Sequence, residues 1–298
     1  MELSFRPPLQ AQALLDWLAA RAVPGVEKVE GARYRRSLRL TRGAGVVEVE
    51  LGGDAVSCRL WLDDERDAGA AVERVRRLLD LDADPDAVAA VLGRDPLLGP
   101  LVAAMPGLRV PGAVDGTELA VRAVLGQQVS VAAARTAAAR LTDAHGERVA
   151  QPQGGVVALF PSAATLAAVD PASLPMPRSR ATALVGLCGA LASGELRLDP
   201  AADRDEALAA LLALPGIGPW TAELVLLRAL GEPDAFPAGD LGLCRALGDP
   251  DVFLVEDLGV RHGLGRIGGP TGLREARELA AGWAPWRSYA SQYLWQAP

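Results

Sequence analysis

The sequence has 298 residues, 50% of them hydrophobic and 22% charged, which is typical of an ordered globular protein with two or three domains. No apolar run approaches the roughly 20 residues that a membrane helix needs. The first residues, MELSFRPPLQ, lack the basic and apolar regions of a signal peptide. We therefore expect a cytoplasmic protein with no membrane contact.

The formal net charge of −7 argues by itself against nucleic-acid binding, because phosphate neutralisation is the usual main source of affinity. Only Lys28 among the 30 basic residues is a lysine. The others are arginines, which suit bidentate phosphate contacts and stacking on aromatic rings. Backbone N–H groups at helix ends can also hold DNA, and net charge does not count them. DNA binding therefore stays open.

The cysteines and histidines indicate no metal site and no cofactor. Cys58, Cys188 and Cys244 form no CxxC pair, and three thiols cannot supply the four ligands of an iron–sulfur cluster. The two histidines, His145 and His262, are far apart in the sequence and read as surface or helix-end residues.

Residues 1–88 predict a mixed α/β domain. The stretch ALLDWLAARAV is typical of a helix. Three alternating runs follow, YRRSLRL, VVEVEL and VSCRLWL, and glycine-rich turns separate them. We expect a small antiparallel sheet with one or two helices.

Residues 89–298 predict an all-α domain, because Ala- and Leu-rich segments follow one another between Pro and Gly breaks. The expected helices cover residues 117–126, 130–146, 163–169, 179–194, 204–213, 219–230 and 273–296. The fold class is therefore α+β.

A hairpin sequence, LPGIGPWTA at 214–222, lies between two of these predicted helices. Gly216 and Gly218 allow backbone N–H groups to turn outward at the start of the next helix, where the helix dipole also favours an anion. The pattern predicts a phosphate clamp. The alternative is a plain helix–helix turn with a glycine cap.

Asp240 stands twenty residues after Trp220, in FPAGDLGL, where it can N-cap the helix that follows. A tandem duplication complicates its interpretation: RALGEPDAFPAGDL at 228–241 is followed by RALGDPDVFLVEDL at 245–258. Asp257 is thus the second copy of Asp240.

The hairpin followed by an aspartate twenty residues on resembles the signature of the helix-hairpin-helix base-excision glycosylases. Within them the chain is most similar to the DNA-3-methyladenine glycosylase II (AlkA) type. Five further segments resemble that type in the same order: FRPP, LDWLAARAV, LRVPGAVD, AVRAVLGQQVSV and WAPWRSYASQYLW. The resemblance implies an enzyme that flips alkylated purines, such as 3-methyladenine, out of double-stranded DNA and hydrolyses their glycosidic bond. We expect a monomer.

The resemblance also assigns residues. It implies Asp240, or its rival Asp257, as the catalytic carboxylate, and Trp17, Trp220 and Trp295 as walls of the base pocket. The residues implied in DNA binding are Gln127, Gln128, Leu214, Gly216, Ile217, Gly218 and Thr221. Lyases of this superfamily carry lysine at the position of Trp220. The only lysine here, Lys28, lies in the N-terminal domain, so a Schiff base on the hairpin helix is excluded.

This assignment agrees with the chemistry. Breaking an N-glycosidic bond leaves a cation-like sugar, which a carboxylate can stabilise. A general acid is dispensable when the base is already cationic, and electron-rich aromatic faces attract such a base. Spacing from the hairpin favours Asp240, whereas spacing from the C-terminal segment favours Asp257; we expect Asp240.

The sequence departs from the AlkA pattern at a few positions. Gln128 stands where an apolar wedge is expected, and Leu224, Leu241 and Gln296 stand where further pocket tyrosines are expected. Three alternatives stay open: the same fold acting on oxidised or deaminated bases, a non-catalytic DNA-binding protein, and a small-molecule enzyme.

Overall fold

Five antiparallel strands form a sheet in the order β1-β5-β4-β3-β2 in the computed structural model, which describes residues 1–240, 243 and 273–297. The strands are β1 (Glu2–Leu3), β2 (Glu27–Glu30), β3 (Arg33–Arg39), β4 (Ala44–Leu51) and β5 (Val56–Leu62). The three runs predicted as strands are β3, β4 and β5, and the sheet predicted from them is confirmed.

The two faces of the sheet pack against different elements. Side chains alternate along β4, so that Val47 and Val49 face a core formed with α1 (Ala11–Arg21) and α2 (Ala68–Leu78). Val46 faces the other way, toward a second, two-stranded sheet of β6 (Glu147–Gln153) and β7 (Val156–Leu159). The five-stranded sheet is therefore covered on both faces.

Helices make up most of the remaining described chain. They are α3 (Pro85–Leu92), α4 (Gly99–Ala104), α5 (Gly116–Leu125), α6 (Val131–His145), α7 (Ala163–Ala167), α8 (Arg178–Ser193), α9 (Arg204–Ala213), α10 (Pro219–Ala229), α12 (Leu273–Ala280) and α13 (Arg287–Gln296). The predicted helices from 117–126 to 219–230 correspond to α5 to α10, to within two residues at each end.

Two details differ from the expectation. Residues 147–159 form the β6–β7 hairpin, although only helices were expected there. The helix expected over 273–296 is two helices, because a 3-10 turn (Ala281–Trp283) and Pro285 interrupt it. The domain division expected at residue 88 falls within α3 and stays a prediction.

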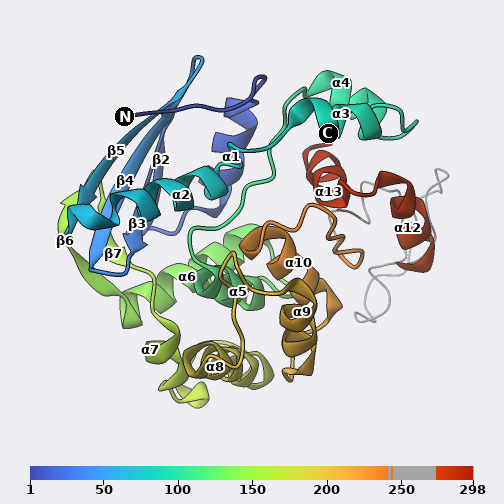
Figure 1. The fold of residues 1–298 in the computed structure, drawn as a ribbon. Helices are drawn as coiled ribbons and strands as arrows, with labels where there is room; N and C mark the ends of the chain where they lie inside the picture. The colour runs from blue at the N-terminus through green and yellow to red at the C-terminus, as the bar shows by residue number, and fades with distance from the viewer. Residues whose placement is uncertain (241–242, 244–272, 298) are drawn as a thin grey trace.

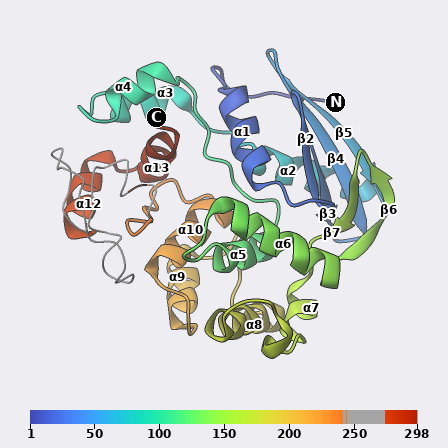
Figure 2. The ribbon, with the colours of Figure 1, turned by 180° about the vertical axis from the view of Figure 1, so that it is seen from behind.

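The C-terminal helix α13 lies beside α3 and α4 and close to α10 (Figures 1 and 2). Tyr293 donates to the Met105 carbonyl after α4 at 3.3 Å, and the Trp283 indole donates to Asp95 at 2.9 Å. These contacts hold the end of the chain against its middle. Among the described residues, no helix has the length and apolar character required to cross a membrane.

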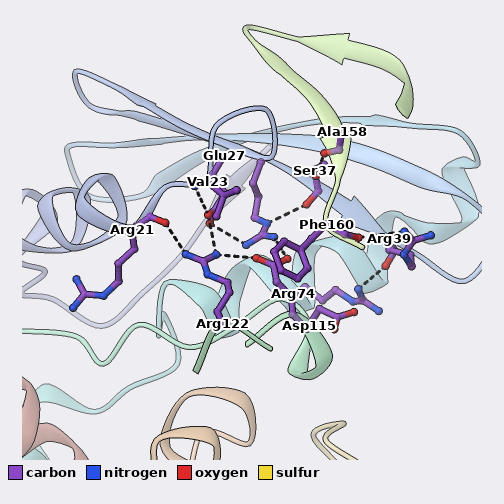
Figure 3. A network of polar contacts seen from close by, with 12 residues as sticks. Arg21, Val23, Glu27, Ser37, Arg39, Arg74, Asp115, Arg122, Ala158 and Phe160 are labelled. Atoms are coloured by element: carbon purple, nitrogen blue, oxygen red, sulfur yellow. Dashed lines mark hydrogen bonds and ion pairs between the residues drawn. The ribbon is translucent and has the colours of Figure 1, made fainter. Parts of the chain in front are cut away.

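A buried ionic network joins the five-stranded sheet to α5 (Figure 3). Arg36 in β3 donates to Glu118 at 2.6 Å and to Glu27 at 3.2 Å, and Arg122 donates to the same two carboxylates at 2.8 and 2.9 Å. Burial alone would raise the pKa of Glu27, but Arg122 and Arg36 offset it and lower that pKa. The two positive charges of Arg36 and Arg122 balance the two negative charges of Glu27 and Glu118, so the network holds the sheet against α5 without an unpaired buried ion.

Candidate active site

The hairpin between α9 and α10 is held on the surface by one buried residue. Ile217 is only 5% exposed and packs in the helical core, whereas Pro215, Gly216 and Gly218 are exposed. Gly216 has a φ of +83°, and a Cβ there would approach the Ala183 Cβ of α8 to 2.6 Å. Glycine is therefore required at Gly216 for both backbone conformation and close packing.

Helix α10 begins with exposed backbone. Its N-cap is Gly218, which has no side chain to cap the helix, and Pro219 at the first helical position has no N–H. The backbone N–H groups of the first turn and the helix dipole can together attract a phosphate. This geometry fits the predicted phosphate clamp.

Gln127 braces the hairpin from the end of α5. The Gln127 amide donates to the Gly216 carbonyl and to the Thr221 hydroxyl, both at 3.0 Å. The Arg180 guanidinium of α8 donates to the backbone carbonyl of Gln127 at 2.7 Å. Thr221 is buried, so its hydroxyl holds Gln127 in place.

Gln128 is exposed beside Gln127, with a left-handed φ of +55°. Leu214 is half-buried, and its carbonyl accepts from Ile217 N–H at 3.1 Å.

Two indoles and a backbone N–H group from the described part of the chain donate to the Asp240 carboxylate. The Trp220 indole donates to Oδ2 at 2.9 Å, and the Trp295 indole donates to Oδ1 at 2.8 Å. The backbone N–H of Leu243 also donates to Oδ1, at 3.1 Å, which is an N-cap contact. Asp240 can therefore serve as an N-cap and as the candidate catalytic carboxylate at the same time.

Trp17 and Trp295 contact one guanidinium. The Arg228 Cζ lies 4.7 Å from the Trp17 ring centroid and 5.0 Å from that of Trp295. A second guanidinium, of Arg21, lies 4.4 Å from the Trp17 centroid. The structure thus gathers the three predicted tryptophans and Asp240 into one cluster and adds two arginines.

The surroundings lower the pKa of both arginines. Burial first, and then the charge of Arg21, lower the pKa of Arg228 to about 9, while Asp80 and Asp240 act in the opposite direction. Burial and then Arg122 lower the pKa of Arg21 to about 10, again opposed by Asp240. Both groups stay cationic at neutral pH, so two positive charges interact with the Asp240 carboxylate.

Sequence reasoning missed Arg21 and Arg228. Arg21 had a usable signal, because it stands four residues after Trp17 and such residues share a helix face. Arg228 had none that separates it from the other arginines. Asp257 and Leu241 lie outside the described residues, and Leu224 and Gln296 are half-buried. No group of His, Cys, Asp or Glu within the described ranges could hold a metal ion.

The chain belongs to the HhH-GPD superfamily of base excision DNA repair proteins, whose family model matches residues 121–287. The AlkA N-terminal domain model matches residues 1–115. Both matches agree with the resemblance drawn from the hairpin and the flanking segments.

Two relatives extend over nearly the whole chain. It is 45% identical over 295 residues to the "Probable bifunctional transcriptional activator/DNA repair enzyme AlkA" of Mycobacterium tuberculosis, covering 99% of this chain and 56% of the relative. The chain thus spans about half the length of that relative. It is 36% identical to "DNA-3-methyladenine glycosylase 2" of Escherichia coli, covering 98% of this chain and 95% of the relative.

Solved structures share the fold. A 3-methyladenine DNA-glycosylase from Archaeoglobus fulgidus has a TM-score of 0.79 and 22% identity, covering 99% of this chain and 97% of the other. An 8-oxoguanine glycosylase/lyase from Clostridium acetobutylicum, in complex with double-stranded DNA, has a TM-score of 0.64 and 18% identity, covering 91% and 96%. These low identities bear on the fold alone.

Proposed function

We propose that this chain is a monofunctional DNA glycosylase that flips alkylated purines, such as 3-methyladenine, out of double-stranded DNA and hydrolyses their N-glycosidic bond. The observation that carries the proposal is the Asp240 carboxylate, which accepts hydrogen bonds from the Trp220 indole of α10, the helix after the hairpin, and from the Trp295 indole of α13. The family relationship and the names of the relatives support the same activity.

The hairpin would hold the DNA. Exposed backbone at Gly216 and Gly218 would bind a phosphate beside the damaged nucleotide, which fixes the strand relative to α10. Gln127 keeps that backbone in place, and the exposed Gln128 beside it would enter the gap that the flipped base leaves. A glutamine there can fill the gap and hydrogen-bond the orphaned base.

Asp240 would act on the sugar. As the bond between C1′ and the base nitrogen breaks, the base departs with the bonding electron pair and positive charge develops on the sugar. The carboxylate stabilises that charge, and water then adds its oxygen to C1′ and loses a proton. An alkylated purine is already cationic, so its departure needs no proton from the protein.

Trp220 also bears on the absence of strand cleavage. A lyase on this fold would need an amine at the hairpin helix to attack C1′. Lys28 is the only lysine in the sequence, and it lies in β2 of the five-stranded sheet, paired with Glu30 at 2.7 Å. Hydrolysis by water is therefore the chemistry that these residues support.

A deaminated base is the second candidate substrate, and one observation favours it. Two cationic side chains lie on the pocket tryptophans, and positive charge there repels a cationic base. A non-catalytic DNA-binding role is less well supported, since gripping phosphate needs no carboxylate between two indoles.

The proposal is tested by release of free base from duplex DNA that contains one 7-methylguanine, measured by chromatography under single-turnover conditions. Base release that leaves an intact abasic site supports it, and no release at any enzyme concentration contradicts it. The proposal also expects a monomer that works in the cytoplasm on chromosomal DNA, and size-exclusion chromatography tests the oligomeric state.

A further inference from the structure

Arg21 lies over Trp17, one of the rings of the proposed base pocket. It is the last residue of α1, one turn after Trp17, and its guanidinium carbon lies 4.4 Å from the centre of the Trp17 ring. A guanidinium is planar and cationic, as is a purine alkylated at N3 or N7. The Arg21 guanidinium therefore lies on the ring against which such a base would stack.

Of the two arginines on Trp17, Arg228 is anchored and Arg21 is not. Arg228 is 3% exposed and donates to the Pro111 carbonyl at 2.8 Å and to Gln292 at 2.7 Å. Arg21 is half-buried, and the hydrogen bond from its guanidinium goes to the Trp17 carbonyl of its own helix, at a long 3.4 Å. A base that enters the pocket would displace Arg21 more easily than Arg228.

The backbone of Arg21 stays fixed when its side chain moves. Arg122 of the buried network donates to the Arg21 carbonyl at 2.6 Å. Figure 3 shows the Arg21 side chain extending away from that network. A displaced guanidinium therefore stays tethered near Trp17 and keeps its charge close to the base.

We propose that Arg21 is a specificity-determining residue: its charge favours excision of neutral purines, such as hypoxanthine, over cationic ones, such as 7-methylguanine. This inference rests on the proposed glycosylase function and deepens it. Arg21 also interacts electrostatically with Asp240, so it competes with a cationic base for the same carboxylate. A neutral base meets neither the repulsion nor that competition. It leaves C1′ with the bonding electron pair as an anion, which takes up the proton that the attacking water loses.

The size of the effect follows from Coulomb's law in a partly solvated site. One unit charge several ångströms from another changes an equilibrium or a rate on the order of three- to tenfold at an effective dielectric between protein and water. Arg228 acts equally in all the variants below, so it cancels from their comparison.

The experiment compares two duplexes of identical sequence, one with 7-methylguanine and one with hypoxanthine. The measured quantity is the ratio of their single-turnover excision rates, cationic over neutral, with the same enzyme preparation. Arg21→Gln removes the charge and keeps a planar polar end, whereas Arg21→Lys keeps the charge. Arg66→Gln, on the exposed pair with Asp64, is the matched control.

We expect Arg21→Gln to raise the ratio about three- to tenfold, and Arg21→Lys and Arg66→Gln to leave it near the wild-type value. Because both rates come from one preparation, a loss of folded protein cancels from the ratio. An unchanged or lower ratio in Arg21→Gln overturns the proposal, as does an equal rise in Arg21→Lys. If the wild type releases neither base, the proposed glycosylase function fails instead.

Discussion

Asp240 and Trp295 stand 55 residues apart in the chain, and the Trp295 indole donates to Asp240 Oδ1 at 2.8 Å. The bond ties the C-terminal helix α13 to the loop after α10. Trp220, at the other end of α10, donates to the second carboxylate oxygen. Three segments thus fix the position of one carboxylate, which is the preorganisation that stabilising a developing cation requires.

The first prediction concerns Asp240→Asn. The substitution preserves shape but removes the charge, and the asparagine amide nitrogen would face one of the two indole N–H donors. We expect excision of 7-methylguanine to fall on the order of 10²-fold or more. Single-turnover kinetics measure the rate, and a binding assay with abasic-site DNA should show affinity within a few-fold of the wild type.

Asp257→Asn is the matched control, because Asp257 occupies the equivalent position of the second repeat copy. We expect it to keep most of the activity. The reverse pattern, with Asp257→Asn inactive and Asp240→Asn active, would show that the second copy supplies the catalytic carboxylate.

The second prediction separates the hydrogen bonds of the tryptophans from their rings. Trp220→Phe and Trp295→Phe each keep an aromatic face and remove one donor to Asp240. We expect each to lower the excision rate about tenfold, the cost of one charge-assisted hydrogen bond of roughly 1.5 kcal/mol. Trp286→Phe is the control, since that ring packs edge-on against Tyr289. Equal rates in all three variants would contradict the role of the indole N–H groups.

The third prediction concerns the hairpin. Gly216→Ala forces an L side chain into a left-handed conformation and against Ala183, so we expect weaker DNA binding and a lower melting temperature. Gly186→Ala in α8 is the matched control, because a Cβ there meets nothing within 4 Å. It should bind DNA normally and be more stable by about 0.5–1 kcal/mol. Equal DNA affinity in the two variants would count against the clamp.

How far the sequence predicts the fold depends on the element. Strands β3 to β5 alternate apolar and polar residues, and helices α5 to α10 have clear Pro, Gly and Asp boundaries, so both are predictable. Strand β6, with the sequence ERVAQPQ, contains Pro152 and is largely exposed. Its pairing depends on β7 and on Val46 of the large sheet, which no local pattern reveals.

The site shows a similar limit. Trp17, Trp220, Trp295 and Asp240 could be named because motif spacing points to them. The N-cap role of Asp240 could also be predicted, because its partner, Leu243 N–H, lies three residues on. The hydrogen bond from the Trp295 indole could not, because that ring comes from a distant segment. The sequence also could not show which of its many arginines, Arg21 and Arg228, join the site, because that depends on how α1, α10 and α13 meet.

The fourth prediction tests the monofunctional mechanism. Incubation of the protein with alkylated duplex DNA and borohydride should trap no covalent adduct, and the abasic product should stay unnicked until treated with alkali. The expectation follows because Lys28, the only lysine, lies in β2 and pairs with Glu30. An adduct that persists in Lys28→Arg with a blocked N-terminus would contradict it.

The last prediction concerns Asp80, a half-buried carboxyl that interacts electrostatically with Arg228. Burial raises its pKa from 3.8 to about 6, although Val110 N–H and the Tyr289 hydroxyl, both 2.9 Å away, act in the opposite direction. A carboxyl whose pKa rises on folding favours the folded state only while it is protonated. Its ionisation should therefore lower the free energy of unfolding as the pH rises from about 4 through about 6, by about 3 kcal/mol at most.

Asp80→Asn isolates this effect. Asparagine tolerates the left-handed φ of +52° and can still accept from Val110 and Tyr289, but it does not ionise in this range. Other carboxyls, such as Glu27, titrate in both proteins, so the measured quantity is the difference in unfolding free energy between wild type and variant at each pH. We expect the wild type to lose stability relative to the variant as the pH rises from 4 to 7. A difference that stays constant would show that Asp80 ionises in the folded protein as it does in the unfolded chain.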